Sequence, residues 1–287
     1  MNDAYIAKFW KKTEENKVKC GLCPHYCEIN EGRVGKCGVR INVGGTLIAS
    51  NYGKVTSIAL DPIEKKPLYM YRQGKKIVSI GSYGCNFNCQ FCQNHSISID
   101  YKGIRPDLMT PELIREVALM SVNDSNIGVA YTYNEPLVGY EFVLDSAILI
   151  REAGLVNILV TNGYINQEPL KKLLNYISAV NIDIKGYQGR TYERVGGTLD
   201  PVKRTVETAN SYCHVEVTTL IIPNENEEDV EEIAKWLSGI NPDIPYHLSR
   251  FYPRYNYYDR TPTPPETMYK LQEKAKKYLK NVFLGNM

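Results

Sequence analysis

Short apolar runs alternate with longer amphipathic stretches along most of the chain, from Lys75 to its last residues. The short runs predict strands at 77–81, 127–131, 156–161, 180–184, 215–222, 246–251 and 282–284. The amphipathic stretches predict helices near 111–121, 137–153, 169–177, 202–212, 227–237 and 265–279. Such alternation is typical of a parallel sheet with right-handed crossovers. Because the repeated units are too few to close an eight-unit barrel, we expect an α/β fold, a partial (β/α)6 barrel of TIM type.

The first part of the chain lacks this pattern. Residues 45–60 predict a β-hairpin that turns at Tyr52-Gly53, and 61–74 predict an extended connection whose lysines, Lys65 and Lys66, are solvated. We therefore expect two parts. Residues 1–74 form a Cys-rich N-terminal segment with a β-hairpin, and residues 75–287 form the partial barrel.

Composition and charge narrow the class of protein. The chain has 287 residues, of which 43% are hydrophobic, and a net charge of +2. This charge is too small for the basic patch of a typical nucleic-acid binder, so nucleic acid is an unlikely partner. The longest apolar runs are too short to span a bilayer, and the N-terminus lacks a signal peptide. We expect a cytoplasmic protein, in which clustered cysteines bind metal rather than form disulfides.

The cysteines fall into three groups along the chain. Four lie close together at Cys20, Cys23, Cys27 and Cys37, three more at Cys85, Cys89 and Cys92, and Cys213 stands alone as a predicted core residue. Four thiolates can close a metal site, whereas three leave one coordination position open.

The group of three follows the first strand of the predicted barrel, at the end where barrel enzymes place their chemistry. Its C-x3-C-x2-C spacing allows three thiolates to bind one face of a [4Fe–4S] cluster. The alternative is a zinc site, which would require a fourth ligand such as His95.

These residues resemble a known family. Cys85-x3-Cys89-x-Phe91-Cys92, with an aromatic residue before the last cysteine, is similar to the signature of radical S-adenosylmethionine (SAM) enzymes. In that family the amino and carboxylate groups of SAM chelate the open iron of a [4Fe–4S] cluster. One electron then cleaves SAM and yields a 5′-deoxyadenosyl radical. The resemblance implies the same cofactors here, and SAM as the missing ligand.

The resemblance extends to the ends of later strands. Glu135, in "YTYNEP", matches a carboxylate that receives the SAM amino group, although a helix N-terminal role is the alternative. Asp183-x-Lys185 resembles a motif of pyruvate formate-lyase activating enzymes that contacts SAM or substrate, and a plain ion pair is the alternative. Val160 replaces an aspartate of those activases. Two further residues, Thr161 and Arg250, are weaker candidates for contacts with SAM or substrate.

The N-terminal cysteines suit a zinc ion, because the glycines around them free the backbone, and an auxiliary [4Fe–4S] cluster is the competing interpretation. The segments 20–40, 61–69 and 84–94, in that order, resemble the radical SAM enzymes of the AmmeMemoRadiSam system, which are similar to pyruvate formate-lyase activating enzymes. This implies an electron donor such as ferredoxin or flavodoxin, and a possible protein partner of Memo or AMMECR type. The alternatives are a glycyl-radical-enzyme activase and a non-enzymatic zinc-bearing binding module.

Overall fold

The computed structural model describes residues 5–287. Its centre is an eight-stranded sheet in the order β15-β14-β13-β12-β11-β10-β8-β7, in which all strands are parallel except β7. These strands are β7 Ser57–Pro62, β8 Lys76–Gly81, β10 Asn126–Tyr131, β11 Val156–Thr161, β12 Ala179–Asp183, β13 His214–Ile221, β14 Tyr246–Arg250 and β15 Val282–Gly285. The predicted α/β barrel, with its mainly parallel sheet, is confirmed.

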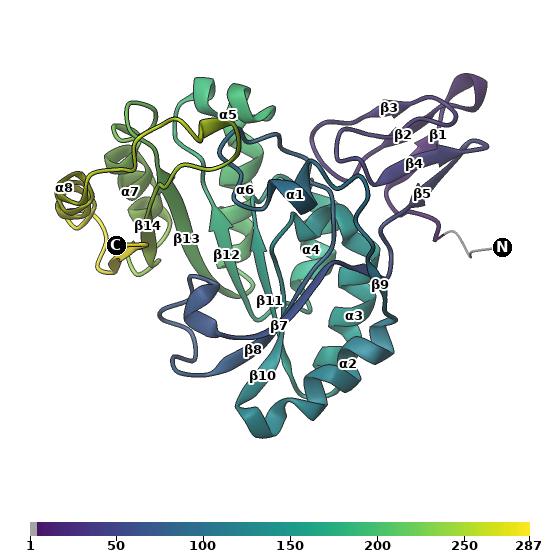
Figure 1. Cartoon of the computed structure of the whole chain (residues 1–287), viewed down its shortest axis with the longest axis horizontal. Coiled ribbons are helices and arrows are strands. Elements are labelled where there is room, and N and C mark those ends of the chain that lie inside the picture. Colours follow the sequence, from purple (N-terminus) through teal and green to yellow (C-terminus); the bar gives the residue numbers. More distant parts are fainter. Residues whose placement is uncertain (1–4) are drawn as a thin grey trace.

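Helices cover the outer side of this curved sheet (Figure 1). They are α2 Pro111–Met120, α3 Tyr140–Glu152, α4 Gln167–Leu174, α6 Leu199–Asn210, α7 Asp229–Ile240 and α8 Pro265–Ala275. Two short helices, α1 His95–Ser98 and α5 Gly189–Val195, lie in the loops that follow β8 and β12 (Figure 1). The 3-10 turns are η1 Glu14–Asn16, η2 Ile63–Lys65, η3 Val122–Asp124, η4 Pro136–Gly139 and η5 Tyr255–Tyr257. The strands are continuous apolar runs because a parallel sheet is buried on both faces. The sequence did not predict α1 or α5.

Residues 10–55 form small sheets that project from one side of the barrel (Figure 1). The strands are β1 Trp10–Lys12, β2 Val18–Cys20, β3 Glu28–Ile29, β4 Arg40–Val43, β5 Thr46–Ala49 and β6 Lys54–Val55, the last of which pairs with β9 Asp107–Leu108. The predicted hairpin within 45–60 is wrong. β5 pairs with β4, with only Gly44 and Gly45 between them, and β7 pairs with β8 in the main sheet. The strands on the two sides of the predicted turn at Tyr52-Gly53 therefore have different partners.

A segment between β7 and β8, residues 63–75, crosses the bottom of the barrel and is called here the floor segment. Its backbone N–H groups at Tyr69 and Met70 donate to the buried carboxylate of Glu216 on β13, at 3.0 and 2.8 Å. The Asn181 amide of β12 donates to Pro67 O at 2.8 Å. The floor segment therefore closes one end of the barrel and leaves the other end open.

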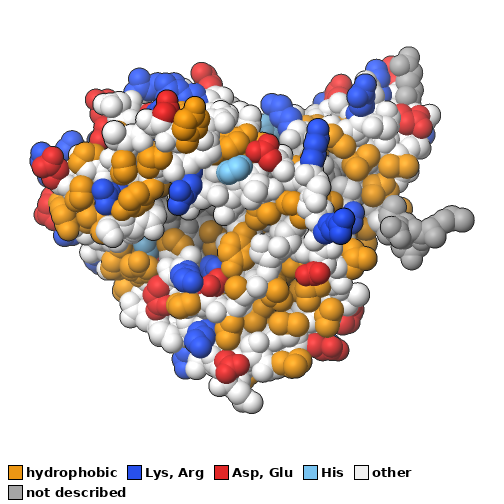
Figure 2. Space-filling model, viewed as in Figure 1, with side chains coloured by type: hydrophobic (Ala, Val, Ile, Leu, Met, Phe, Trp, Pro, Cys, Tyr) orange, Lys and Arg blue, Asp and Glu red, His pale blue; other side chains and the backbone are white. Residues whose placement is uncertain are grey.

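Two surface findings complete the fold. Among residues 5–287, no helix combines the length and the apolarity needed to cross a membrane. On the face shown in Figure 2, Lys and Arg side chains are interspersed with Asp and Glu. This mixture matches the small net charge and shows no one-sign patch on that face.

Candidate active site

A cavity of about 730 Å³ opens at the carboxyl ends of the parallel strands, above the floor segment. Parallel strands bring the residues that follow them to one rim, which is where barrel enzymes carry their chemistry. Apart from Arg250 and His95, the cavity brings together all the residues of the barrel that the sequence singled out as candidates: Cys85, Cys89, Phe91, Cys92, Glu135, Thr161, Asp183 and Lys185.

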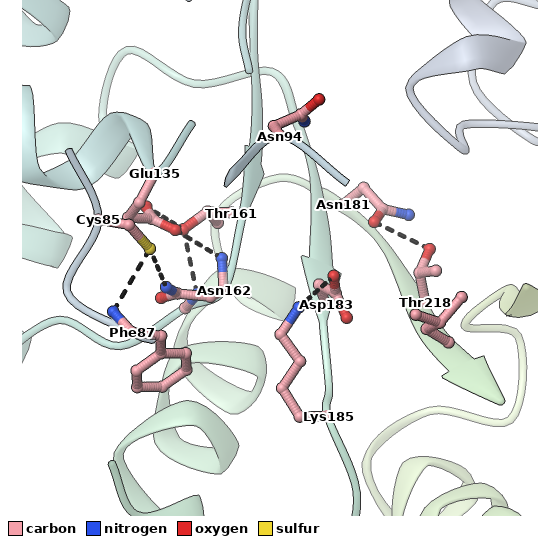
Figure 3. Close-up of polar contacts among 12 residues, drawn as sticks. Cys85, Phe87, Asn94, Glu135, Thr161, Asn162, Asn181, Asp183, Lys185 and Thr218 are labelled. Carbon is pink, nitrogen blue, oxygen red and sulfur yellow. Dashed lines mark hydrogen bonds and ion pairs between the residues drawn. The ribbon is translucent and has the colours of Figure 1, made fainter. Parts of the chain in front are cut away.

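The loop after β8 carries the three cysteines, and its backbone passes close to the N-terminal segment. Gly84 has φ +89°, and a Cβ at this position would lie 2.6 Å from Val39 Cγ1, so glycine is needed for the close approach. Cys85 Sγ accepts the Phe87 N–H at 3.3 Å and lies 3.8 Å from Asn162 Nδ2 (Figure 3). The loop is therefore tied to the end of β11 at the first cysteine.

Burial controls the charge of these thiols. It raises the pKa of Cys85 well above its ordinary value and the pKa of Cys89 to about 12, and it also raises the pKa of Cys92. Without a nearby cation the three groups are neutral thiols at pH 7, which is unfavourable for nucleophilic catalysis. A bound metal deprotonates coordinating thiols outright, so the donor set suits a metal site.

Glu135 is buried beside the cysteine loop and holds three hydrogen bonds. Its carboxylate accepts from Thr161 Oγ1 at 2.6 Å, from Asn162 N at 2.8 Å and from Leu137 N at 3.0 Å (Figure 3). Burial raises its pKa to about 6, although these hydrogen bonds oppose the shift. A cationic or N–H-donating ligand in the cavity would favour the ionised form. Glu135 also caps η4, so the helix N-terminal interpretation describes the same residue.

Asp183 and Lys185 form an ion pair of 2.6 Å at the opposite side of the cavity (Figure 3). Burial alone would lower the pKa of Lys185, but Asp183 and Cys89 more than offset it and raise that pKa. The other oxygen, Asp183 Oδ1, is buried without a hydrogen-bond partner. A buried acceptor of this kind is costly unless a ligand donates to it.

The wall near the floor segment contains a charged cluster that the sequence did not predict. Lys66, expected to be solvated, is 3% exposed and donates to Asp61 at 2.8 Å. Lys65 remains largely exposed and reaches the other Asp61 oxygen at 3.2 Å. Tyr133 donates to Asp61 at 2.8 Å and has φ +71°, a left-handed conformation that is strained for a tyrosine. Lys66 was mispredicted because the carboxylate that pairs with it lies on β7, a strand the sequence did not place in the sheet.

Two other candidates lie elsewhere. The Arg250 guanidinium donates to Thr263 O and Tyr252 OH, both at 2.7 Å, and is thus used within the C-terminal loop. His95, the suggested fourth zinc ligand, contacts Asp100 at 3.2 Å and stacks on Tyr255 with ring centroids 4.5 Å apart. Neither side chain contributes to the cavity wall of the described chain.

Sequence reasoning also missed two polar residues of the cavity wall. Asn162 donates its backbone N–H to Glu135 and its side-chain amide to Asn86 Oδ1, and the same amide lies near Cys85 Sγ. Thr218 donates its hydroxyl to Asn181 at 2.9 Å. Asn162 directly follows the buried strand β11, where a polar side chain at the carboxyl edge is the available signal, whereas Thr218 lies within β13. The Asn162 position in "LVTNGY" carried that signal.

The N-terminal cysteines Cys20, Cys23, Cys27 and Cys37 line a second, small cavity of about 20 Å³. His25, which the sequence left without a partner, places Nε2 2.8 Å from Asn86 O in the cysteine loop. The two cysteine groups therefore belong to two separate cavities. Asn86 lines the small one, and its sequence neighbours Cys85 and Phe87 line the large one.

Several known proteins are similar in sequence to this chain over much of its length. Residues 79–237 match the family model described as the Radical SAM superfamily. The chain is 43% identical to the uncharacterized protein MJ0808 of Methanocaldococcus jannaschii, over 98% of this chain and 85% of the other. It is 27% identical to the putative glycyl-radical enzyme activating enzyme MJ1632 of the same organism, over 71% of this chain and 79% of that one.

Similarity continues at lower levels. The pyruvate formate-lyase-activating enzyme of Clostridium pasteurianum is 26% identical, over 57% of this chain and 72% of that one. Among solved structures, Streptococcus suis SuiB bound to precursor peptide SuiA has a TM-score of 0.57 at 12% identity, over 71% of this chain and 47% of that one, which is a likeness of fold. Because the family match covers more than half of the chain, the protein belongs to the radical SAM superfamily, enzymes that use a [4Fe–4S] cluster and SAM.

Proposed function

We propose that Cys85, Cys89 and Cys92 hold the [4Fe–4S] cluster of this radical SAM enzyme and leave one iron for SAM. The observation that carries the proposal is that these three thiols, of which Cys89 is buried and the other two are half-buried, line the large cavity at the barrel rim, and that no other cysteine of residues 5–287 does so. When bound, the cluster supplies the electron that cleaves SAM to a 5′-deoxyadenosyl radical, which abstracts hydrogen from a substrate not yet identified.

Residues of the chain position SAM in this proposal. Glu135 accepts an N–H of the SAM amino group, because its carboxylate is buried, faces the same cavity and gains from a donor there. Asp183 Oδ1 accepts a hydrogen bond from SAM or substrate, which would satisfy its missing partner. Lys185 holds Asp183 in place. Phe91 and Thr161 line the cavity near these groups and complete the contacts.

The size of the cavity supports a second occupant beside SAM. At about 730 Å³ it lies in the upper part of the range for ligand pockets, roughly 300–1,000 Å³. We assign the wall near the floor segment, with Lys66 and Tyr133, to the substrate, because the contacts proposed for SAM do not use its charged cluster.

The relatives suggest a glycyl-radical-enzyme activase as the second candidate function. Two of them are named as activating enzymes of that kind, at 27% and 26% identity. Val160, which stands where those activases carry an aspartate, lines the cavity and offers no oxygen ligand for a cation beside SAM. We also propose membership of the AmmeMemoRadiSam system, with a Memo or AMMECR-type partner, on the motif order alone. A ferredoxin or flavodoxin would supply the electron.

The N-terminal cysteines are proposed to hold a metal of their own, zinc or a second cluster. Their support is the shared cavity and the small amount of apolar sequence around them, since a metal orders such a segment directly.

The proposal is tested by SAM cleavage. Anaerobically reconstituted protein, reduced with dithionite and given SAM, should form 5′-deoxyadenosine. The triple variant Cys85→Ser, Cys89→Ser, Cys92→Ser should lose this activity by at least about a thousandfold, because the cofactor carries the chemistry. Cys213→Ser, a change outside the cavity, should retain it and serves as the matched control. Unchanged turnover in the triple variant would refute the assignment.

A further inference from the structure

The four N-terminal cysteines surround a space instead of converging on a point. They line one cavity of about 20 Å³ together with Arg40 and Asn86. Within residues 5–287, no three His, Cys, Asp or Glu side chains gather closely enough to hold a single metal ion. A zinc–thiolate bond is about 2.3 Å long, so a zinc site needs its sulfurs gathered around one point, and among the described residues these four are not gathered in that way. The spacing therefore favours a larger group than one ion.

Arg40 supplies an independent indication of what that group is. Its side chain is 1% exposed, and Nη2 donates to both carboxylate oxygens of Glu141, at 3.0 and 2.7 Å. Arg40 Nη1 reaches Lys8 O at 3.5 Å, whereas Arg40 Nε is buried without a partner. A buried, charged N–H without an acceptor is costly, and Arg40 lines the cysteine cavity. An anionic group rich in sulfur acceptors in that cavity would complete its hydrogen bonds.

The position of the cavity favours a redox role over a purely structural one. Its wall includes Asn86, the residue after Cys85 in the loop proposed to bind the first cluster. Asn86 O lies 2.8 Å from His25 Nε2, and its side-chain oxygen accepts from Asn162 Nδ2 at 2.8 Å. Asn162 Nδ2 is in turn 3.8 Å from Cys85 Sγ. A short path of hydrogen bonds therefore leads from His25, which lies between Cys23 and Cys27 in the sequence, to Cys85.

We infer that Cys20, Cys23, Cys27 and Cys37 hold a second iron–sulfur cluster, with Arg40 Nε donating to one of its sulfur atoms. The inference rests on the proposed function in one respect, the identity of the neighbouring rim cluster. The ligands of the second cluster are inferred independently of it. Such a cluster stores one electron taken from an external low-potential one-electron donor. Arg40 is a positioning residue in this account, because it acts through the cluster and touches no substrate.

Metal and sulfide analysis of the anaerobically purified full chain tests the inference. We expect about eight irons and eight sulfides per chain, from two four-iron clusters, and no stoichiometric zinc. The triple serine variant of Cys85, Cys89 and Cys92 should keep about half of the iron and a reducible EPR signal. This variant leaves the N-terminal segment intact, so its result does not depend on whether that segment folds without metal. One zinc with about four irons in the wild type, or an iron-free triple variant, would overturn the inference.

Arg40→Lys tests the hydrogen bond, because lysine keeps the positive charge and loses Nε. In the triple-variant background, where only the N-terminal cluster contributes, it should shift the midpoint potential of the EPR signal. An unchanged potential in protein of full iron content would contradict the role given to Arg40. The two proposals fail separately. SAM cleavage by the triple serine variant tests the proposal for the rim cysteines. The ratio of zinc to iron in the wild type tests the inference for the N-terminal cysteines.

Discussion

The two cysteine-lined cavities are built in different ways. The rim cysteines follow β8 and rest against Glu135 and Asn162, which end neighbouring strands of the main sheet. Cys20 ends β2, and the other three N-terminal cysteines lie in loops beside strands of two to four residues that project from the barrel. The first site is therefore held by a scaffold that exists without the cofactor. The second depends on its metal and on a few anchors for its order.

Those anchors can be identified. Arg40 and Glu141 form a buried ion pair between β4 and α3, with side chains 2% and 0% exposed. Asn166, ahead of α4, donates from Nδ2 to Gly21 O at 2.7 Å and from its backbone N–H to Leu22 O at 3.0 Å. His25 adds the contact to Asn86. The contrast predicts that breaking one anchor loosens the N-terminal segment and spares the barrel.

The largest effect should come from Glu141→Gln. The change leaves the Arg40 charge buried without its counterion, which costs about 3–5 kcal/mol. Hydrogen exchange should therefore accelerate by about a hundredfold or more in β4, while the amides of β11 keep their wild-type protection.

The matched control is Glu168→Gln, which removes an exposed partner of Lys172 and should leave both regions unchanged. Equal acceleration in β4 and β11 would show that the N-terminal segment and the barrel unfold together, against the contrast drawn above.

The next effect concerns the rim. Glu135→Gln should weaken SAM binding about 10- to 100-fold, since a hydrogen bond to a charged group contributes about 1.5–3 kcal/mol. In the wild type, affinity should also fall as the pH drops below about 6, because burial raises the Glu135 pKa to about 6 and protonation removes an acceptor. The carboxylate, and with it the tighter binding, is present above that pH.

Equilibrium binding of SAM at several pH values between 5.5 and 8 measures this. The glutamine variant should lose the pH dependence attributed to Glu135, whereas Glu168→Gln should bind as the wild type does. If Glu135→Gln binds SAM with wild-type affinity and the same pH profile, Glu135 does not receive the amino group.

The smallest effect should come from the hydrogen bonds that connect the C-terminal loop, through Asn256, to the cysteine loop. Asn256 is exposed. Its backbone N–H donates to Gln90 O at 3.0 Å and its side-chain amide donates to Gln90 Oε1 at 2.7 Å. Asn256→Ala should speed the loss of cluster absorbance in air by about two- to fivefold, because one exposed hydrogen bond contributes about 0.5–1 kcal/mol. Asn241→Ala, in a loop after α7, is the control. If both variants lose cluster absorbance at the same rate, the hydrogen bonds of Asn256 do not protect the cluster.

The strands and most of the rim could be predicted from the sequence for a physical reason. Buried parallel strands are continuous apolar runs, and their carboxyl ends meet at one edge. Cys85, Glu135 and Asp183 follow or end such runs, so their order along the chain implied that they share one cavity.

What could not be predicted depends on long-range contacts. β7 pairs with β8 and not with β5, its partner in the predicted hairpin, and Lys66 is buried because β7 brings Asp61 to it. His25 gains a partner only when the cysteine loop folds against the N-terminal segment. The sequence made Arg250 a candidate for a contact with SAM, yet its guanidinium donates hydrogen bonds to Thr263 O and Tyr252 OH. Each of these errors comes from a partner distant in sequence or on a different element.

The most direct test of the rim assignment is spectroscopic. The dithionite-reduced wild-type protein is measured by EPR and electron–nuclear double resonance, with and without SAM that carries a heavy nitrogen isotope in its amino group. We predict that SAM changes the signal of one cluster and that the labelled nitrogen couples to its iron. A spectrum that SAM leaves unchanged at saturation, or one without nitrogen coupling, would contradict the open iron at Cys85, Cys89 and Cys92.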